Sequence, residues 1–178
     1  MIWEDFREML TAQLVSVTGA LAAGTILAFA TDKISLLPGL FILMPGFLAM
    51  RGSIAASLAA RISKALHQHK RSAGNDQSSF GKQNVHASFL LAIATSILLG
   101  VVAYISTKLL FGIDAPGILL ISIIAAFISN VLMIPITFAS TVWLFKHGYD
   151  PDNIMGPYIT AVGDLVSIIS LLTAIAVV

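Results

Sequence analysis

Five apolar segments, each long enough to cross a bilayer, dominate this sequence. They cover approximately residues 12–30, 36–66, 87–107, 117–145 and 155–178. A membrane-spanning helix needs roughly 20 predominantly apolar residues, because the hydrocarbon core of a bilayer is about 30 Å thick. Within that core every backbone N–H and C=O group must be bonded inside the protein, which helices and closed barrels achieve. The sequence therefore predicts an all-α integral membrane protein with five transmembrane helices, in contact with the lipid bilayer.

The composition agrees with a single membrane domain. Of the 178 residues, 57% are hydrophobic and 11% are charged, whereas a soluble domain carries roughly 25% charged residues. Nothing outside the five segments is long enough to bury a second core, so residues 1–178 are expected to form one domain. The net charge of +1 gives no indication of a nucleic-acid partner, and a chain without cysteine has no thiolate metal site.

Two of the segments depart from a plain span. Residues 1–11 alternate apolar and acidic side chains at helical spacing, which predicts a short interfacial helix, with a simple helical lead-in to the first span as the alternative. The second span exceeds the length that a bilayer requires. It is expected to be a long helix, kinked or interrupted near residues 45–52, because it contains Pro38, Pro45, Gly46 and Gly52.

Residues 67–85 are polar, basic and rich in turn-forming residues, which predicts a mobile cytoplasmic loop. We expect its histidines, His67 and His69, to be solvated and not to bind metal, since no third ligand lies nearby in the sequence.

The basic residues predict the orientation of the chain. Residues 61–86 contain Arg61, Lys64, Lys70, Arg71 and Lys82, and the loops on the opposite side hold Lys33 and Lys108. By the positive-inside rule, the N-terminus and the 61–86 and 146–153 regions face the cytoplasm. With five spans the C-terminus is then extracytoplasmic, in a multi-pass protein of the cell membrane.

Asp164 is the acidic residue that lies deepest in a span. It is about 13 Å along the last helix from the start of that segment, at about 1.5 Å of rise per residue. A charge near the bilayer centre costs about 2.5–3.5 kcal/mol on insertion scales, so such residues are paired, face a bundle interior or line an ion path. We expect an ion path, and the alternative is an aspartate neutralised by a proton or an internal hydrogen bond. Thr160 and Ser167 share its helical face, and Gly156 lies at the start of the same helix.

Arg51 is the second charged residue well inside a span. It could neutralise Asp164 as a structural pair, or its long side chain could reach a membrane boundary while Asp164 faces a wet path. The extra length of the second span favours the boundary position.

Several uncharged positions in the spans are candidates to line the same path. Ala49, Ser53, Ala56, Ser57 and Ala60 form a small helix face, for which helix packing and path lining are equally favoured. Asn130 is mid-span, where an interhelical hydrogen bond is favoured over lining the path.

These residues predict a hydrated divalent cation, Mg²⁺ first, held by Asp164. Mg²⁺ takes oxygen ligands, keeps several waters and uses one or two carboxylates. One acid per chain is too few for a dry cage but suits an ion on the two-fold axis of a homodimer. An enzyme is not expected. The alternatives are a membrane-embedded metal-dependent enzyme using Asp150 and Asp152, or a structural membrane subunit.

Two stretches resemble the MgtE-type magnesium transporters and their animal solute-carrier relatives. One is Gly148-Tyr149-Asp150-Pro151-Asp152-Asn153 with Pro157-Tyr158-Ile159-Thr160-Ala161-Val162-Gly163-Asp164-Leu165, and the other is residues 43–54 followed by 58–63. The resemblance implies a Mg²⁺ channel or transporter that works as a homodimer. It aligns Asp164 with the family's pore aspartate and the Thr160 carbonyl with a further contributor. It departs from the family at Ser53 and Gly156, where relatives have asparagine. The predicted metal site is therefore Asp164 with Thr160, and the predicted lining residues are Ser53, Ser57, Gly156, Ser167 and Asn130.

Overall fold

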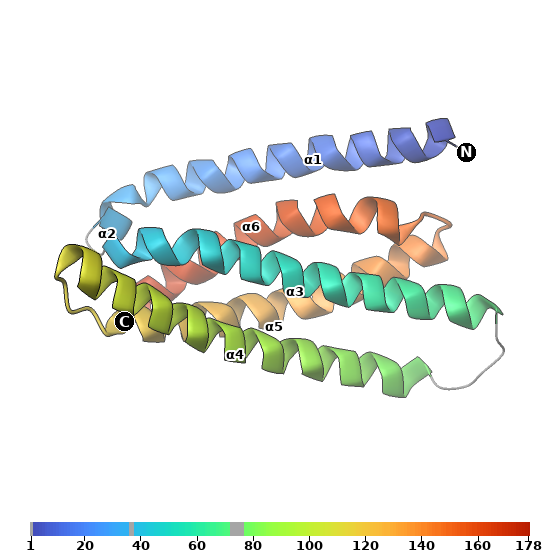
Figure 1. Ribbon diagram of the computed structural model, residues 1–178. Helices are drawn as coiled ribbons and strands as arrows, with labels where there is room; N and C mark the ends of the chain where they lie inside the picture. The colour runs from blue at the N-terminus through green and yellow to red at the C-terminus, as the bar shows by residue number, and fades with distance from the viewer. Residues whose placement is uncertain (1, 36–37, 72–76) are drawn as a thin grey trace.

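The computed structural model describes residues 2–35, 38–71 and 77–178, which are helical with short connections and contain no strand (Figure 1). Five of the helices are long and apolar enough to cross a membrane. The prediction of an all-α protein with five transmembrane helices is therefore confirmed. The helices are α1 (Ile2–Phe29), α2 (Thr31–Ser35), α3 (Pro38–Arg71), α4 (Gln77–Phe111), α5 (Gly117–Lys146) and α6 (Pro151–Val177).

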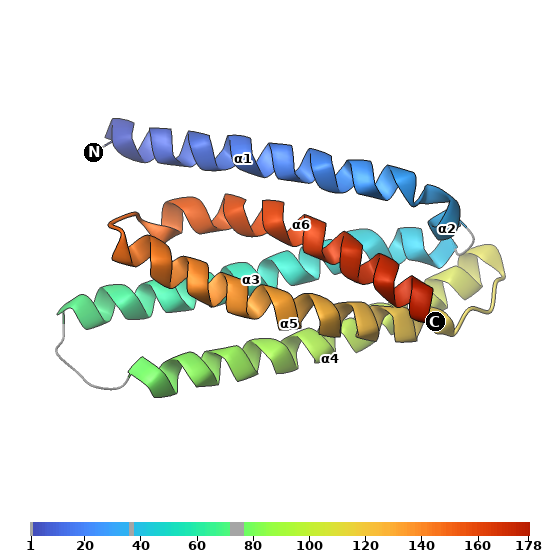
Figure 2. The same cartoon turned by 180° about the vertical axis from the view of Figure 1, so that it is seen from behind.

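Helices α3, α5 and α6 form the middle of the bundle, where each packs against the other two. Helix α1 packs against α6, and α4 packs against α3 and α5. In Figure 1, α6 lies between α1 and α3, and Figure 2 shows α5 beside it from behind. The two ends of the chain lie at opposite ends of the bundle, as an odd number of spans requires (Figures 1 and 2). Which end faces the cytoplasm stays a prediction.

The core joins α3, α5 and α6 through large apolar side chains with at most 3% exposure. Leu40, Leu43 and Phe47 of α3 pack in one cluster with Ile118 and Ile121 of α5 and Leu171 of α6. Other large apolar residues point outward, among them Leu21, Leu90, Leu98 and Leu109. An uncovered apolar surface of this kind suits contact with lipid tails, in which outward-facing leucine is stable.

Small residues allow the closest approach between helices. Gly19 of α1 faces Ala161 of α6, where an added Cβ would lie 2.7 Å from the Ala161 Cβ. Gly100 of α4 faces the backbone of Leu119 in α5, at 3.1 Å by the same construction. Such contacts let backbones approach closely and increase van der Waals packing, which holds helices together in a membrane.

Residues 2–11 form the first turns of α1. Of the two alternatives for this segment, the structure therefore has the helical lead-in and not a separate interfacial helix. No glycine or proline occurs between Ile2 and Thr18 to end a helix, which explains the continuity. Met1 lies outside the described residues.

The predicted interruption of the second span is wrong. Helix α3 runs unbroken through Pro45 and Gly52. A proline removes one hydrogen bond, that to the carbonyl four residues earlier, and the surrounding turns keep theirs. A kink at Pro45 stays a prediction.

The predicted loop 67–85 is too long. α3 continues to Arg71 and α4 begins at Gln77, while residues 72–76 and the side chain of His69 lie outside the described part of the chain. The added helical turns contain Gln68, Lys70, Arg71, Gln77, Lys82 and Gln83, which are favourable in helices.

Candidate functional site

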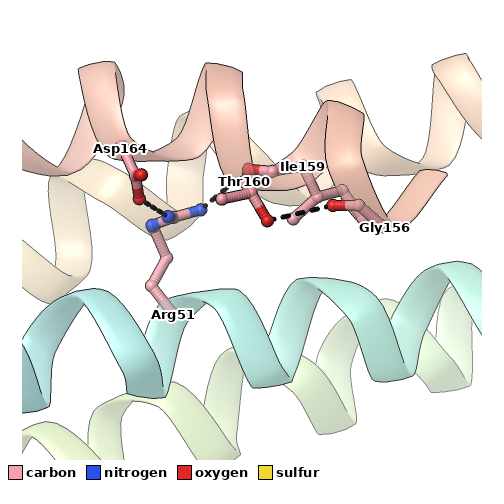
Figure 3. A network of polar contacts seen from close by, with 5 residues as sticks. All are labelled: Arg51, Gly156, Ile159, Thr160 and Asp164. Carbon is pink, nitrogen blue, oxygen red and sulfur yellow. Dashed lines mark hydrogen bonds and ion pairs between the residues drawn. The ribbon is translucent and has the colours of Figure 1, made fainter. Parts of the chain in front are cut away.

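The two charges that lie deep in the spans form an ion pair (Figure 3). Nη2 of Arg51, from α3, donates to Oδ1 of Asp164, from α6, at 3.0 Å. The Arg51 side chain is 1% exposed and that of Asp164 is 18% exposed. The expectation that Arg51 reaches a membrane boundary is therefore wrong, and the pairing alternative is confirmed. Arg51 lies about 20 Å along α3 from its first residue, at about 1.5 Å per residue, too far for the side chain to reach that helix end.

Gly163 makes room for this pair. A Cβ at Gly163 would overlap the guanidinium of Arg51, so the group lies directly against the backbone of α6. Its Nη1 donates to the carbonyl of Ile159 at 3.4 Å, and its buried Nε has no hydrogen-bond partner (Figure 3). A guanidinium carries five N–H donors, and the Arg51 group makes one hydrogen bond from Nη1 and one from Nη2.

Asp164 is the last residue of an uncovered row on α6. Asp152, Gly156, Thr160 and Asp164 are spaced by four residues and therefore lie on one face of the helix. We call these four residues the α6 ridge. The first three are exposed, Asp164 is partly buried, and Ile168, the next residue in the row, is 3% exposed. The ridge thus extends about 18 Å along the helix, at about 1.5 Å per residue. It ends at Asp164 because the next residue of the row, Ile168, is buried.

Several hydroxyl and carbonyl oxygen atoms lie along the α6 ridge. The Thr160 hydroxyl donates to the carbonyl of Gly156 at 3.0 Å (Figure 3). Pro157 lies inside α6 and has no N–H, so the carbonyl of Asn153 lacks its usual helical donor. The carbonyl of Thr160 lies within the regular helix, where it is directed toward the N–H of Asp164 and keeps one further lone pair.

Ser53 and Ser57 are exposed on α3, on a different side of the helix from the buried Arg51 that meets Asp164. Ser53 follows Arg51 by two residues, so at about 100° per residue their side chains point about 160° apart. Ser53 and Ala49 instead line a groove of about 560 Å³ between α3 and α4. The small face of α3 is therefore directed away from the Arg51–Asp164 pair.

The other two predicted lining residues are buried. Ser167, one turn beyond Asp164, has no exposure and its hydroxyl has no hydrogen-bond partner. Asn130 is 2% exposed, and its Nδ2 donates to the carbonyl of Ala126 at 2.7 Å. This hydrogen bond lies within α5 and does not join two helices.

His67 meets Asp150 and Asp152 at the end of the bundle where α6 begins. Their potential ligand atoms all lie within 4.8 Å of one another, and all three residues are exposed. The sequence points to Asp150 and Asp152 as possible metal ligands but gives no signal that His67 joins them. That contact arises because α3 continues through His67 and carries it to the α5–α6 turn. Asp150 also caps α6, since its Oδ1 accepts from the N–H of Asp152 at 3.0 Å. Acidic residues stabilise a helix N-terminus in this position, so the cluster needs no metal to explain it.

Comparison with known protein families gives a match. A family model described as "MgtE: Divalent cation transporter" matches residues 44–174. The matched range contains Arg51, Gly163 and the whole α6 ridge. No curated protein and no solved structure matches the chain.

Proposed function

The chain belongs to the MgtE family of divalent cation transporters, and from this premise we propose that it moves Mg²⁺ along the α6 ridge to Asp164. That family transports divalent cations and is not an enzyme family, so the enzyme alternative built on Asp150 and Asp152 is set aside. The observation that carries the proposal is the ridge itself. A carboxylate deep in a membrane-spanning helix lies at the closed end of a row of exposed positions.

The ligand chemistry of the ridge favours a hydrated ion. Between Asp152 and Ile168 the row contains one carboxylate, that of Asp164. The Thr160 hydroxyl and backbone oxygens lie one helical turn from it. Mg²⁺ demands octahedral oxygen coordination, dehydrates reluctantly and keeps several waters. We therefore propose that Asp164 binds the ion largely through water and that Thr160 contributes an oxygen to the same hydration shell.

A second copy of the chain would complete the path. In one chain the α6 ridge is exposed at Asp152, Gly156 and Thr160. In a membrane this face would place a hydrated cation against lipid, which is strongly unfavourable. A homodimer with a two-fold axis beside the ridge would close the path and bring two Asp164 residues toward one ion.

Cysteine substitution at Thr160 is expected to link two copies of the chain. The natural sequence has no cysteine, so a single substitution gives an unambiguous product. Thr160 is exposed on the ridge and would lie near the two-fold axis. Oxidation of the Thr160→Cys protein in membranes should give a dimer band on a non-reducing gel.

Ile169→Cys is the matched control for this experiment. Ile169 is 52% exposed on the same helix, but at about 100° per residue it points about 180° away from Thr160. After oxidation, the Ile169→Cys protein should run as a monomer on the same gel. Equal crosslinking at both positions, or none at Thr160, would contradict the proposed dimer face.

The His67 side chain is expected to be dispensable for transport. It is exposed, and the neighbouring carboxylates of Asp150 and Asp152 already serve the first turn of α6. His67→Ala should change Mg²⁺ flux into proteoliposomes by less than about twofold, which corresponds to about 0.4 kcal/mol. A loss of more than about tenfold would show that the cluster binds the ion on its way to Asp164.

A further inference from the structure

We propose that Arg51 is a built-in cation that occupies Asp164 when no metal is bound, and that a divalent ion binds there only by displacing the guanidinium. This inference rests on the proposed function, since it concerns the same carboxylate. It assigns to Arg51 a role in setting the affinity of the site for cations, beyond its part in the packing of α3 on α6.

The charge of Arg51 decides how strongly Asp164 attracts a cation. Arg51 and Asp164 are joined by a charged hydrogen bond of 3.0 Å, so the pair as a whole has no net charge. Two copies of a neutral pair remain neutral, and a divalent cation placed beside them would meet little net attraction. Because Coulomb energy falls only as the inverse of distance, the guanidinium cancels most of the attraction that the carboxylate exerts on a cation a few ångströms away. The ion gains the full attraction of Asp164 only when the guanidinium has moved away.

The guanidinium of Arg51 is buried, but it has few strong hydrogen bonds. Arg51 is 1% exposed, yet its buried Nε has no partner and its bond to the Ile159 carbonyl is long, at 3.4 Å. The contact that holds it well is the one to Asp164. A structural arginine usually donates to several acceptors through its rigid fork of N–H groups. Arg61, in the same helix, differs in that its Nε is satisfied. Its Nε donates to the carbonyl of Ser57 at 3.1 Å, and its Nη2 donates to the Ser88 hydroxyl at 3.0 Å.

Gly163 permits the state in which the Arg51 guanidinium occupies Asp164. The guanidinium lies where the first side-chain atom of any other residue would be. A methyl group at this position would push the guanidinium off α6 without removing its charge. Glycine thus lets an arginine from α3 reach a carboxylate that is otherwise open toward the α6 ridge.

The test is a Mg²⁺ titration of the purified full chain, followed by its melting temperature. Arg51→Met removes the charge and keeps a long apolar side chain. It should lower the melting temperature without Mg²⁺, because Asp164 is left unpaired. It should also shift the Mg²⁺ midpoint to a concentration at least about tenfold lower, because a charged hydrogen bond no longer competes for the carboxylate. Arg61→Met, the matched control, should leave the midpoint unchanged.

Gly163→Ala keeps the inference falsifiable if Arg51→Met does not fold. Alanine is favoured over glycine inside a helix, and the atoms it would meet are the flexible end of a side chain. We expect the Mg²⁺ midpoint to shift in the same direction, by about threefold or more. Unchanged or weaker Mg²⁺ binding in both variants, or in Gly163→Ala alone where the other fails to fold, would overturn the inference and leave Arg51 as a structural partner.

Asp164→Asn in the same titration separates the two proposals. Loss of the Mg²⁺ response supports Asp164 as the ion site, and the Arg51 and Gly163 variants then decide the inference. A Mg²⁺ response that persists in Asp164→Asn would overturn the proposed function itself, and the inference with it.

Discussion

Asp164→Asn is expected to abolish divalent cation flux and to destabilise the protein. Asparagine keeps the shape of the side chain and removes its charge, so Arg51, 1% exposed, is left buried without its counter-ion. Breaking a buried pair by removing one partner costs about 3–5 kcal/mol. The measurements are thermal unfolding and the flux of Mg²⁺, Mn²⁺, Co²⁺ and Ca²⁺ into proteoliposomes.

The double variant Arg51→Met/Asp164→Asn separates stability from transport. It removes both charges, so it leaves no uncompensated buried charge, which is the main cost of breaking such a pair. It should therefore recover most of the unfolding free energy lost in Asp164→Asn while its flux stays at background. Flux that returned together with stability would show that Asp164 acts in folding and not in holding the ion.

Gly19→Leu is expected to separate α1 from α6 and to lower the free energy of unfolding. Among the described helices α1 contacts α6 and α2, so the contact with α6 is its main attachment to the bundle. At Gly19 even one carbon would lie 3.0 Å from the Cα of Ala161, an atom that cannot move without moving the helix. Overpacking of this kind costs about 1–3 kcal/mol, occasionally more. Unfolding in mixed micelles, followed by circular dichroism, measures the change.

Gly24→Leu is the matched control for that prediction. Gly24 lies on the same helix and is exposed, and a Cβ placed there would meet nothing within 4 Å. The change should stay within about 0.5 kcal/mol, as for most exposed substitutions. Equal effects of the two variants would mean that the α1–α6 contact does not limit stability.

The span architecture and the central acid were both predictable from the sequence. Runs of apolar residues longer than a bilayer core leave the backbone no alternative to helices in lipid, so five spans follow from residue types alone. Asp164 stands out for a similar reason, because a carboxylate in the middle of such a run is costly wherever the helix packs. Neither statement depends on how the helices are arranged.

The partners of Asp164 were decided by the tertiary structure. Arg51 lies 113 residues away in the sequence, and only the packing of α3 on α6 brings its guanidinium to the carboxylate. The same packing turns Ser53 and Ser57 away from Asp164, although their spacing resembles a path-lining face. It also places His67 beside Asp150 and Asp152. Periodicity specifies which residues share a face of one helix, whereas the rotation of each helix about its axis, and so the neighbour that each face meets, depends on close contacts such as those of Gly163 and Gly19.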